Sequence, residues 1–308
     1  MSVREFQAKL SIFFFLFCCA KGVFLEQQVF LPEEDVPEAL GAAVSAPGLA
    51  IREPEPIIFE FIADPGEFAT TSFAGAAGTN AQFEISHPYT VSLRRRSDLG
   101  YFCAGVLIGK RHVLTAAHCL DTARTSSDDR PEVVVGSASS SETSGVGVQT
   151  IATVNAYVHP NYRSQRAPDL AILELENDAN KTPVQLPAKF VPRRGDALLA
   201  IGWGRKSSSS GNSEIVQIAS MNYMLRRTCV QRVFGPVFNH QVCMGGEGPS
   251  TCEGDNGGPI VLPGDTRADD VLVGIVGSSH VCGRSNKPDV HTNVWPYVDW
   301  IRTTAGIS

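Results

Sequence analysis

The sequence predicts an all-β protein. From residue 88 onward, short runs of β-branched and apolar residues alternate with turns rich in Gly, Pro and Ser. This texture is typical of β-sandwiches and β-barrels, and no helical period competes with it before the C-terminus. The chain of 308 residues is long enough for one large all-β domain or two modest ones.

The expected elements follow that texture along the chain. One helix is expected at the end, where Trp295, Val298, Trp300 and Ile301 give an apolar face after Pro296. Strands are expected at residues 89–93, 102–108, 113–115, 133–135, 170–175, 197–201, 215–221, 271–276 and 290–294.

The N-terminal part of the chain differs in character. Residues 1–20 combine Arg4 and Lys9 with an apolar run too short to span a bilayer, which predicts a secretory signal peptide. Residues 21–77 are acidic and rich in proline and are expected to be a pro-segment or a disordered arm. A solvated linker is favoured there, although the apolar run at 57–62 leaves open an added strand or a docking segment. Residues 78–308 then form the folded domain.

The cysteines indicate an oxidising compartment. Eight are present, and Cys18 and Cys19 fall within the predicted signal peptide. The remaining six suggest three disulfides, for which spacing alone leaves fifteen connectivities open. With the signal peptide and no later apolar stretch of similar length, this predicts a secreted protein without a membrane span.

One loop determines how the other sequence motifs are interpreted. Residues 252–259 read Cys-Glu-Gly-Asp-Asn-Gly-Gly-Pro. This resembles the Gly-Asp-Ser-Gly-Gly-Pro loop of the chymotrypsin/trypsin-like serine protease family, with Asn256 where the family has its reactive serine. Further resemblances lie at 102–108, 115–119, 168–175, 202–204 and 286–294, so the likeness covers about residues 78–304.

The resemblance implies a fold and a set of residues. The fold would be two antiparallel six-stranded Greek-key β-barrels with a C-terminal helix. His118 would occupy the position of the catalytic base, Asp169 would orient it, and the N–H groups of Gly254 and Asn256 would form the oxyanion hole. The disulfides would join Cys103 to Cys119, Cys229 to Cys243, and Cys252 to Cys282.

Asn256 decides the chemistry that we expect. Acyl transfer in this family needs an oxygen nucleophile that gives its proton to a neighbouring imidazole. An asparagine amide has no acidic hydroxyl, and its nitrogen lone pair is delocalised. The sequence therefore predicts a catalytically inactive homologue in which His118 and Asp169 are remnants.

Two further departures lie around the same site. Active relatives expose an N-terminal Ile-Val-Gly-Gly whose ammonium pairs with the aspartate before the serine, whereas residues 75–78 here read Gly-Ala-Ala-Gly. Asp255 is therefore expected to lack its activating partner, and a restored serine alone is not expected to restore the enzyme. The specificity pocket is altered too, with Ser250 at its base, Ser279 on one wall and Asp289 where glycine is usual.

Two functions from different classes remain open. The favoured one is a secreted, inactive homologue that binds an extracellular protein, with a hydrolase or a protease among the candidates, as an inhibitor, cofactor or decoy. The alternative is a serine-type endopeptidase with residual or unconventional activity. No cofactor is expected, and the seven histidines show no spacing that suits a metal site.

The remaining surface features are few. Nucleic acid is not expected as a partner, because Arg94-Arg95-Arg96 is one short basic cluster in a domain with 22 Lys and Arg against 21 Asp and Glu after residue 80. The sequon Asn180-Lys181-Thr182 permits one N-linked glycan on Asn180 in a eukaryotic secretory pathway.

Overall fold

The computed structural model describes residues 86–121, 130–163, 168–207, 209–233, 235–246, 249–277 and 287–307. The chain divides into two units, residues 1–75 and 76–308, and the first lies wholly outside the described residues. The signal peptide at 1–20 and the acidic arm at 21–77 are therefore still predictions. No helix in the described ranges has both the length and the hydropathy needed to cross a membrane.

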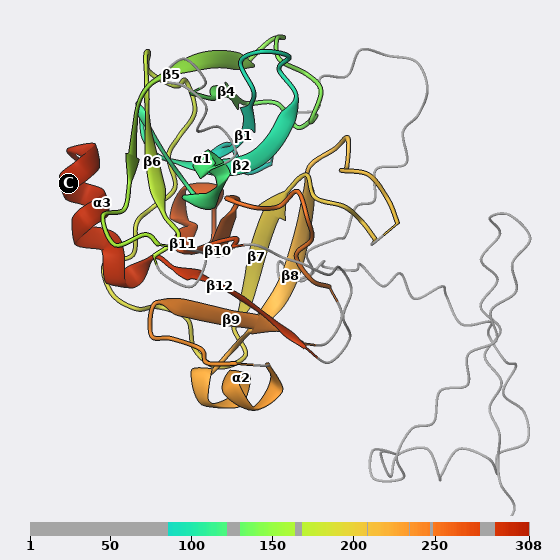
Figure 1. Cartoon of the computed structure of the whole chain (residues 1–308), viewed down its shortest axis with the longest axis vertical. Helices are drawn as coiled ribbons and strands as arrows, with labels where there is room; N and C mark the ends of the chain where they lie inside the picture. The colour runs from blue at the N-terminus through green and yellow to red at the C-terminus, as the bar shows by residue number, and fades with distance from the viewer. Residues whose placement is uncertain are drawn as a thin grey trace, which may run out of the picture. The chain divides into compact units, whose positions relative to one another are not determined.

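The described chain folds as two closed antiparallel β-barrels of six strands each, which confirms the predicted fold class (Figure 1). The first barrel has the order β1-β2-β3-β6-β5-β4 and the second β10-β11-β12-β9-β8-β7. The first comprises β1 (Thr90–Arg94), β2 (Tyr101–Gly109), β3 (His112–Thr115), β4 (Glu132–Val135), β5 (Gln149–Val158) and β6 (Ala171–Leu175). The second comprises β7 (Ala197–Gly202), β8 (Gln217–Met224), β9 (Gln241–Gly245), β10 (Pro259–Leu262), β11 (Val271–Ile275) and β12 (Pro288–Asn293).

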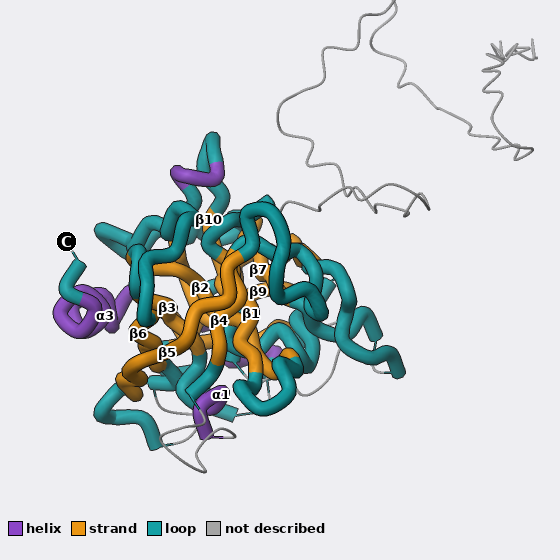
Figure 2. Tube along the Cα trace, turned by 90° about the horizontal axis from the view of Figure 1, so that it is seen from above, coloured by secondary structure: helices purple, strands orange, loops and turns teal. Residues whose placement is uncertain are grey.

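Helical elements lie outside the barrels. They are α1 (His118–Asp121), α2 (Arg226–Arg232), the 3-10 turns η3 (Arg267–Asp269) and η4 (Trp295–Tyr297), and α3 (Val298–Ala305). Helix α3 packs beside β6, with Val298, Ile301 and Ala305 buried, and the view from above separates it clearly from the strands (Figure 2). Trp295 lies in η4 and is 38% exposed, so it does not belong to the buried face that the sequence predicted.

The core explains why the chain closes in this way. The first barrel is filled by the inward side chains of its strands, and this cluster continues into the second barrel through Leu199, Ile201 and Val261. The second barrel has a core of its own around Leu198 and Met244. Because one apolar cluster spans the seam, burial of that surface favours the packed pair of barrels over either barrel alone.

Three strands and two helices, the four-residue α1 and α2, were missed in the sequence. Strand β5 buries only two of its ten side chains, β9 and β10 are short, and β10 begins at Pro259, so none of them shows a clear period-two pattern. Strand β8 lies two to three residues later than expected. Helix α2 buries only Cys229, so its sequence shows no apolar period. The disulfide from Cys229 to Cys243 fixes this helix to β9.

A buried polar contact also joins the barrels. Tyr89, just before β1, donates its hydroxyl proton to Oδ2 of Asp270, just before β11, at 2.6 Å. Asp270 is fully buried and also accepts the Gly264 N–H at 2.9 Å. Burial and the hydrogen bond to this carboxylate raise the pKa of Tyr89. A buried carboxylate needs such donors, because an unpaired one is costly.

We expect Tyr89→Phe to lower the free energy of unfolding by about 1 to 3 kcal/mol, because it leaves a buried carboxylate oxygen one donor short. Urea unfolding followed by fluorescence measures the change. Tyr157→Phe is the matched control: its hydroxyl bonds Glu174 at the surface, and its loss should change stability by less than about 0.5 kcal/mol. Equal effects of the two substitutions would show that the buried contact contributes nothing special.

Candidate functional site

Strand register brings His118 and Asp169 together. Strand β3 pairs with β6 so that Thr115 lies opposite Ala171. His118 follows β3 by three residues, and Asp169 precedes β6 by two. The imidazole Nδ1 therefore lies 2.7 Å from Oδ2 of Asp169, and the His118 backbone N–H donates to Oδ1 at 2.9 Å.

This pairing favours one tautomer of the neutral imidazole. Asp169 is almost completely buried, and its two oxygens both accept bonds from His118. An Nδ1–H that donates to the carboxylate leaves Nε2 of the neutral ring as the proton acceptor. The pair can thus orient a base, as the resemblance implied for these two residues.

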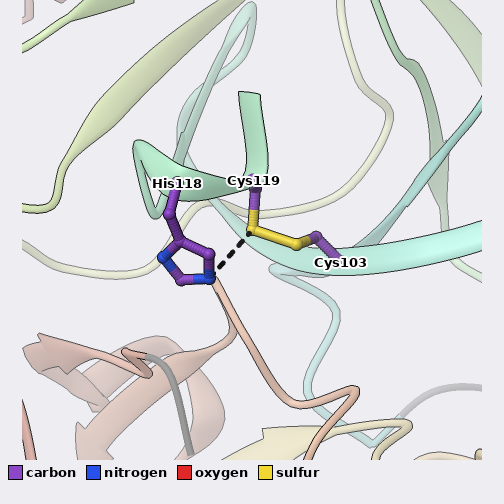
Figure 3. Close-up of side chains that lie close together, drawn as sticks. All are labelled: Cys103, His118 and Cys119. Atoms are coloured by element: carbon purple, nitrogen blue, oxygen red, sulfur yellow. Dashed lines mark hydrogen bonds between the residues drawn. A yellow bond between two sulfur atoms is a disulfide. The ribbon is translucent and has the colours of Figure 1, made fainter. Parts of the chain in front are cut away.

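The imidazole also lies against a disulfide. Nε2 of His118 is 4.0 Å from Sγ of Cys119, which is bonded to Cys103 (Figure 3). These three residues place their ligand atoms within 4.8 Å of one another, as a metal site would. Metal coordination requires thiolates, however, and both sulfurs are committed to the disulfide. The geometry therefore gives no reason to assign a metal here.

The Asn256 loop is fixed by its backbone. The Ala104 N–H of β2 donates to the Asn256 carbonyl at 2.8 Å. Gly257 has a φ of +79°, and a Cβ at this position would collide with the Ala104 carbonyl oxygen and with Oγ1 of Thr115. Only glycine permits both this conformation and this close approach. The loop of the second barrel is thereby held against the first.

The side chain of Asn256 makes no hydrogen bond within the described residues, to His118 or to any other group, and its Oδ1 is buried without a hydrogen-bond partner. The backbone N–H groups of Gly254 and Asn256 likewise donate to no acceptor in that part of the chain. The site therefore offers an oriented imidazole and two free N–H donors, but residue 256 has no hydroxyl.

Tyr101 is a site residue that the sequence reasoning missed. Its hydroxyl donates to the Gly254 carbonyl at 2.5 Å, and its ring packs edge-on against Trp203. Burial, with the nearby charge of Asp255, raises its pKa, so the hydroxyl stays a donor. The only sequence signal was its place at the start of the strand that leads to Cys103. Tyr101 holds the loop at Gly254 through a hydrogen bond that the sequence did not predict.

Asp255 is a partly buried carboxylate with no cationic partner among the described residues. It fits between Gly202 and Gly204, where any Cβ would collide with its side chain. It accepts the Gly204 N–H at 2.8 Å and the Cys252 N–H at 2.9 Å. Burial, with a smaller contribution from the charge of Asp289, raises its pKa to about 6. Its ion pairing with an N-terminal ammonium is still untested, because residues 75–81 lie outside the described ranges.

The predicted pocket residues are described in part. Asp289 lies in β12, and its Oδ2 accepts the Thr251 N–H at 2.8 Å and the Thr251 hydroxyl at 3.1 Å. Ser250 directly precedes this threonine and is partly buried. Asp289 is thus tied to the segment that would form the base of the pocket. Ser279 lies outside the described residues.

Other predicted residues are placed as follows. Among the described cysteines, Cys103 is bonded to Cys119 and Cys229 to Cys243. Cys252 is also disulfide-bonded, and its predicted partner Cys282 lies outside the described residues. Asn180 is exposed, and its N–H donates to Gln149.

Comparisons with known proteins agree with this geometry. The family model for trypsin matches residues 76–301. Trypsin 5G1 of Aedes aegypti is 33% identical over 232 residues, covering 71% of this chain and 81% of the relative. Kallikrein-8 of Homo sapiens is 33% identical over 232 residues (72% and 83%), and anionic trypsin of Canis lupus familiaris 32% over 230 residues (72% and 85%). The chain belongs to the trypsin-like serine protease family.

The raised pKa of Asp255 predicts that ionisation of this carboxyl lowers the free energy of unfolding. A carboxyl with a folded pKa near 6 and an unfolded pKa of 3.8 binds its proton more tightly in the folded state. Its stabilising contribution is therefore present below pH 4 and lost as the pH rises to about 6. We expect wild type to lose about 1 to 3 kcal/mol relative to Asp255→Asn across that window.

Urea unfolding of both proteins at pH 4, 5, 6 and 7 measures this difference, because the other titrating groups cancel in the comparison. If wild type instead gains stability relative to Asp255→Asn as the pH rises, the carboxylate has a cationic partner, and the prediction is wrong.

Proposed function

We propose that this protein is a trypsin-like protease homologue that does not hydrolyse peptide bonds and acts by binding another protein. The observation that carries the proposal is Asn256, which stands where the family's loop motif has serine, in a chain that keeps the His118–Asp169 pair. Proton removal by His118 needs an acidic group at residue 256, and an amide does not supply one. The alternatives that the sequence left open for the binding mode are an inhibitor, a cofactor and a decoy.

The proposed partner is an extracellular protein, with a hydrolase or a protease among the candidates. Disulfide bonds fit a protein that works in an oxidising compartment, and this supports secretion as part of the proposal. Asn180 is exposed within its sequon and is the proposed glycan site. A pull-down from extracellular fluid with the purified chain tests the class of partner.

A second candidate is an endopeptidase with residual or unconventional activity. The imidazole and carboxylate are still paired, and the Gly254 and Asn256 N–H groups have no acceptor in the described chain. In a serine protease that lacks its triad, such features leave roughly a thousandfold acceleration over water. The relatives reported above are trypsins and a kallikrein, which also favours this reading.

We expect wild type to stay unlabelled by an organofluorophosphonate that reacts with active serine hydrolases. We expect Asn256→Ser alone to recover little ester hydrolysis, because Asp255 would still lack an ammonium. The combination with Ile-Val-Gly-Gly as a new N-terminus in place of residues 75–78 should be at least about 100-fold more active than Asn256→Ser, the size of losing one oxyanion donor.

Gel-based labelling and ester hydrolysis by wild type, each single change and the combination measure these effects. Asn256→Ala with the same new N-terminus is the matched control, and it should remain silent. Stoichiometric labelling of wild type would overturn the proposal. Robust turnover by Asn256→Ser alone would show that residue 256 was the only defect.

The pocket residues give a separate prediction. One oxygen of Asp289 is bonded to Thr251, and the other has no partner in the described residues. If the pocket is open, benzamidine should bind through this free oxygen. Asp289→Gly should then weaken binding by about tenfold or more, as expected for a charge-assisted hydrogen bond. Asp289→Asn keeps an acceptor for Thr251 and a side chain of the same size, so its effect on benzamidine binding reports the loss of the negative charge alone. Calorimetry that detects no binding to wild type would show that the pocket is closed.

A further inference from the structure

The fold assembles a cationic surface from two segments far apart in the sequence. Residues 187–197 run along the approach to β7, and residues 223–233 cover the end of β8 and helix α2. We call them together the α2 surface. Its exposed cations are Lys189, Arg193, Arg194, Arg226, Arg227 and Arg232.

Backbone and ring contacts hold the two segments side by side. The Gly195 N–H donates to the Tyr223 carbonyl at 3.2 Å, and the Tyr223 N–H donates to the Asp196 carbonyl at 2.8 Å. The Phe190 ring packs edge-on against the Tyr223 ring with their centroids 6.0 Å apart. Lys189 and the Arg193–Arg194 pair are therefore placed next to the chain that leads into α2, at the base of the second barrel (Figure 1).

The charge of the domain is polarised by this surface. The two segments hold six Lys or Arg and one acid, Asp196, a balance of +5. After residue 80 the chain has 22 Lys and Arg against 21 Asp and Glu, so the remainder carries 16 against 20, or −4. A nearly neutral total thus includes two neighbouring segments with a strongly positive balance of charge. Charges clustered in this way attract a polyanion over roughly a Debye length, about 8 Å at physiological salt.

These cations are available, unlike those that the sequence brought to notice. In the Arg94-Arg95-Arg96 run, Arg94 is buried, Arg95 is bonded to Asp98 and Arg96 to Glu132. By contrast, the side chains of Lys189, Arg193, Arg194 and Arg227 have no hydrogen bond or ion pair in the described structure. Asp196 does not neutralise them by a salt bridge, since its Oδ2 accepts the backbone N–H of Arg193 at 2.7 Å.

The backbone that carries these cations is held in place by hydrogen bonds and a disulfide. Arg226 donates from Nη1 to the Val237 carbonyl at 3.1 Å, and the Cys229–Cys243 disulfide fixes α2 to β9. Residues 193–196 form a turn closed by the Asp196 N–H to the Arg193 carbonyl. Guanidinium groups on such a frame can donate paired hydrogen bonds to sulfate or phosphate oxygens.

We propose that the α2 surface binds a sulfated polysaccharide. A sulfate ester keeps its charge at any physiological pH and matches the arginine fork. The disulfides fit an oxidising, extracellular compartment, where sulfated glycans rather than nucleic acids are the polyanions that a protein meets. Exposed Phe190, which is 42% accessible, adds an apolar contact for a sugar ring at the edge of the charged face. The site is independent of Asn256 and of the proposed protein partner.

The test uses the full chain and a heparin fragment of defined length as the probe. Calorimetry at about 0.15 M NaCl should show binding that weakens steeply with added salt. The triple substitution Arg193→Gln, Arg194→Gln and Arg227→Gln should raise the Kd about 10- to 100-fold, as expected for three lost charge pairs. Desulfated heparin should not bind.

A matched control removes the same charge elsewhere. Arg95→Gln, Arg96→Gln and Arg163→Gln also take away three cations, from the first barrel, and should change the Kd less than about threefold. Equal losses in the two triple variants, or no heparin binding by wild type, would overturn the proposal. Displacement of heparin by duplex DNA at equal charge concentration would also overturn it, because the surface would then be a nucleic-acid or general polyanion site.

Discussion

The architecture depends on the seam where the backbone of the Asn256 loop meets β2. The Ala104 N–H bonds the Asn256 carbonyl, and the Gly257 N–H bonds the Val276 carbonyl, so the loop is held between the two barrels. Since a Cβ at residue 257 would collide with β2, glycine is required for this approach. The position of the loop is therefore a consequence of how the barrels pack, and His118 and Asp169 lie together because β3 and β6 are in register.

Two carboxylates near this seam show how the protein treats buried charge. Asp270 has a tyrosine hydroxyl, a backbone N–H and the Arg267 guanidinium 3.8 Å away. Within the described residues Asp255 has only backbone N–H groups as partners, and burial raises its pKa to about 6. A carboxylate without a cation is the less stable arrangement. The loop that carries Asp255 is thus the part of the site whose stability depends most on pH.

The sequence predicted the fold because the buried strands are short, apolar and bounded by turns, and because the loop motifs are specific. It placed His118 and Asp169 correctly relative to their strands, since each follows or precedes a strongly patterned segment. It could not reveal strand β5, in which only two side chains are buried, or helix α2, whose position is fixed by a disulfide.

Contacts between segments far apart in the chain could not be predicted from the sequence either. Tyr101 acts on Gly254 across 153 residues, and the α2 surface joins Arg193 and Arg194 to Arg226 and Arg227 through the pairing of the chain around Tyr223. Linear inspection gave weight to the Arg94-Arg95-Arg96 run because its residues are adjacent. In the fold Arg94 is buried, and Arg95 and Arg96 form ion pairs. Adjacency in the sequence therefore did not show which cations are able to bind a ligand.

The fold does not depend on the side chain at residue 256. The contacts described for the loop are made by other groups, among them the carbonyl of Asn256 itself, the glycine that follows, the carboxylate of Asp255 and the hydroxyl of Tyr101. The amide of Asn256 makes no hydrogen bond in the described chain, and its buried oxygen is a cost rather than a support. A change at this atom alters the available chemistry without removing any interaction on which the barrels depend. Structure and catalysis are therefore separable at this position, and the same frame can serve a protein whose function is binding.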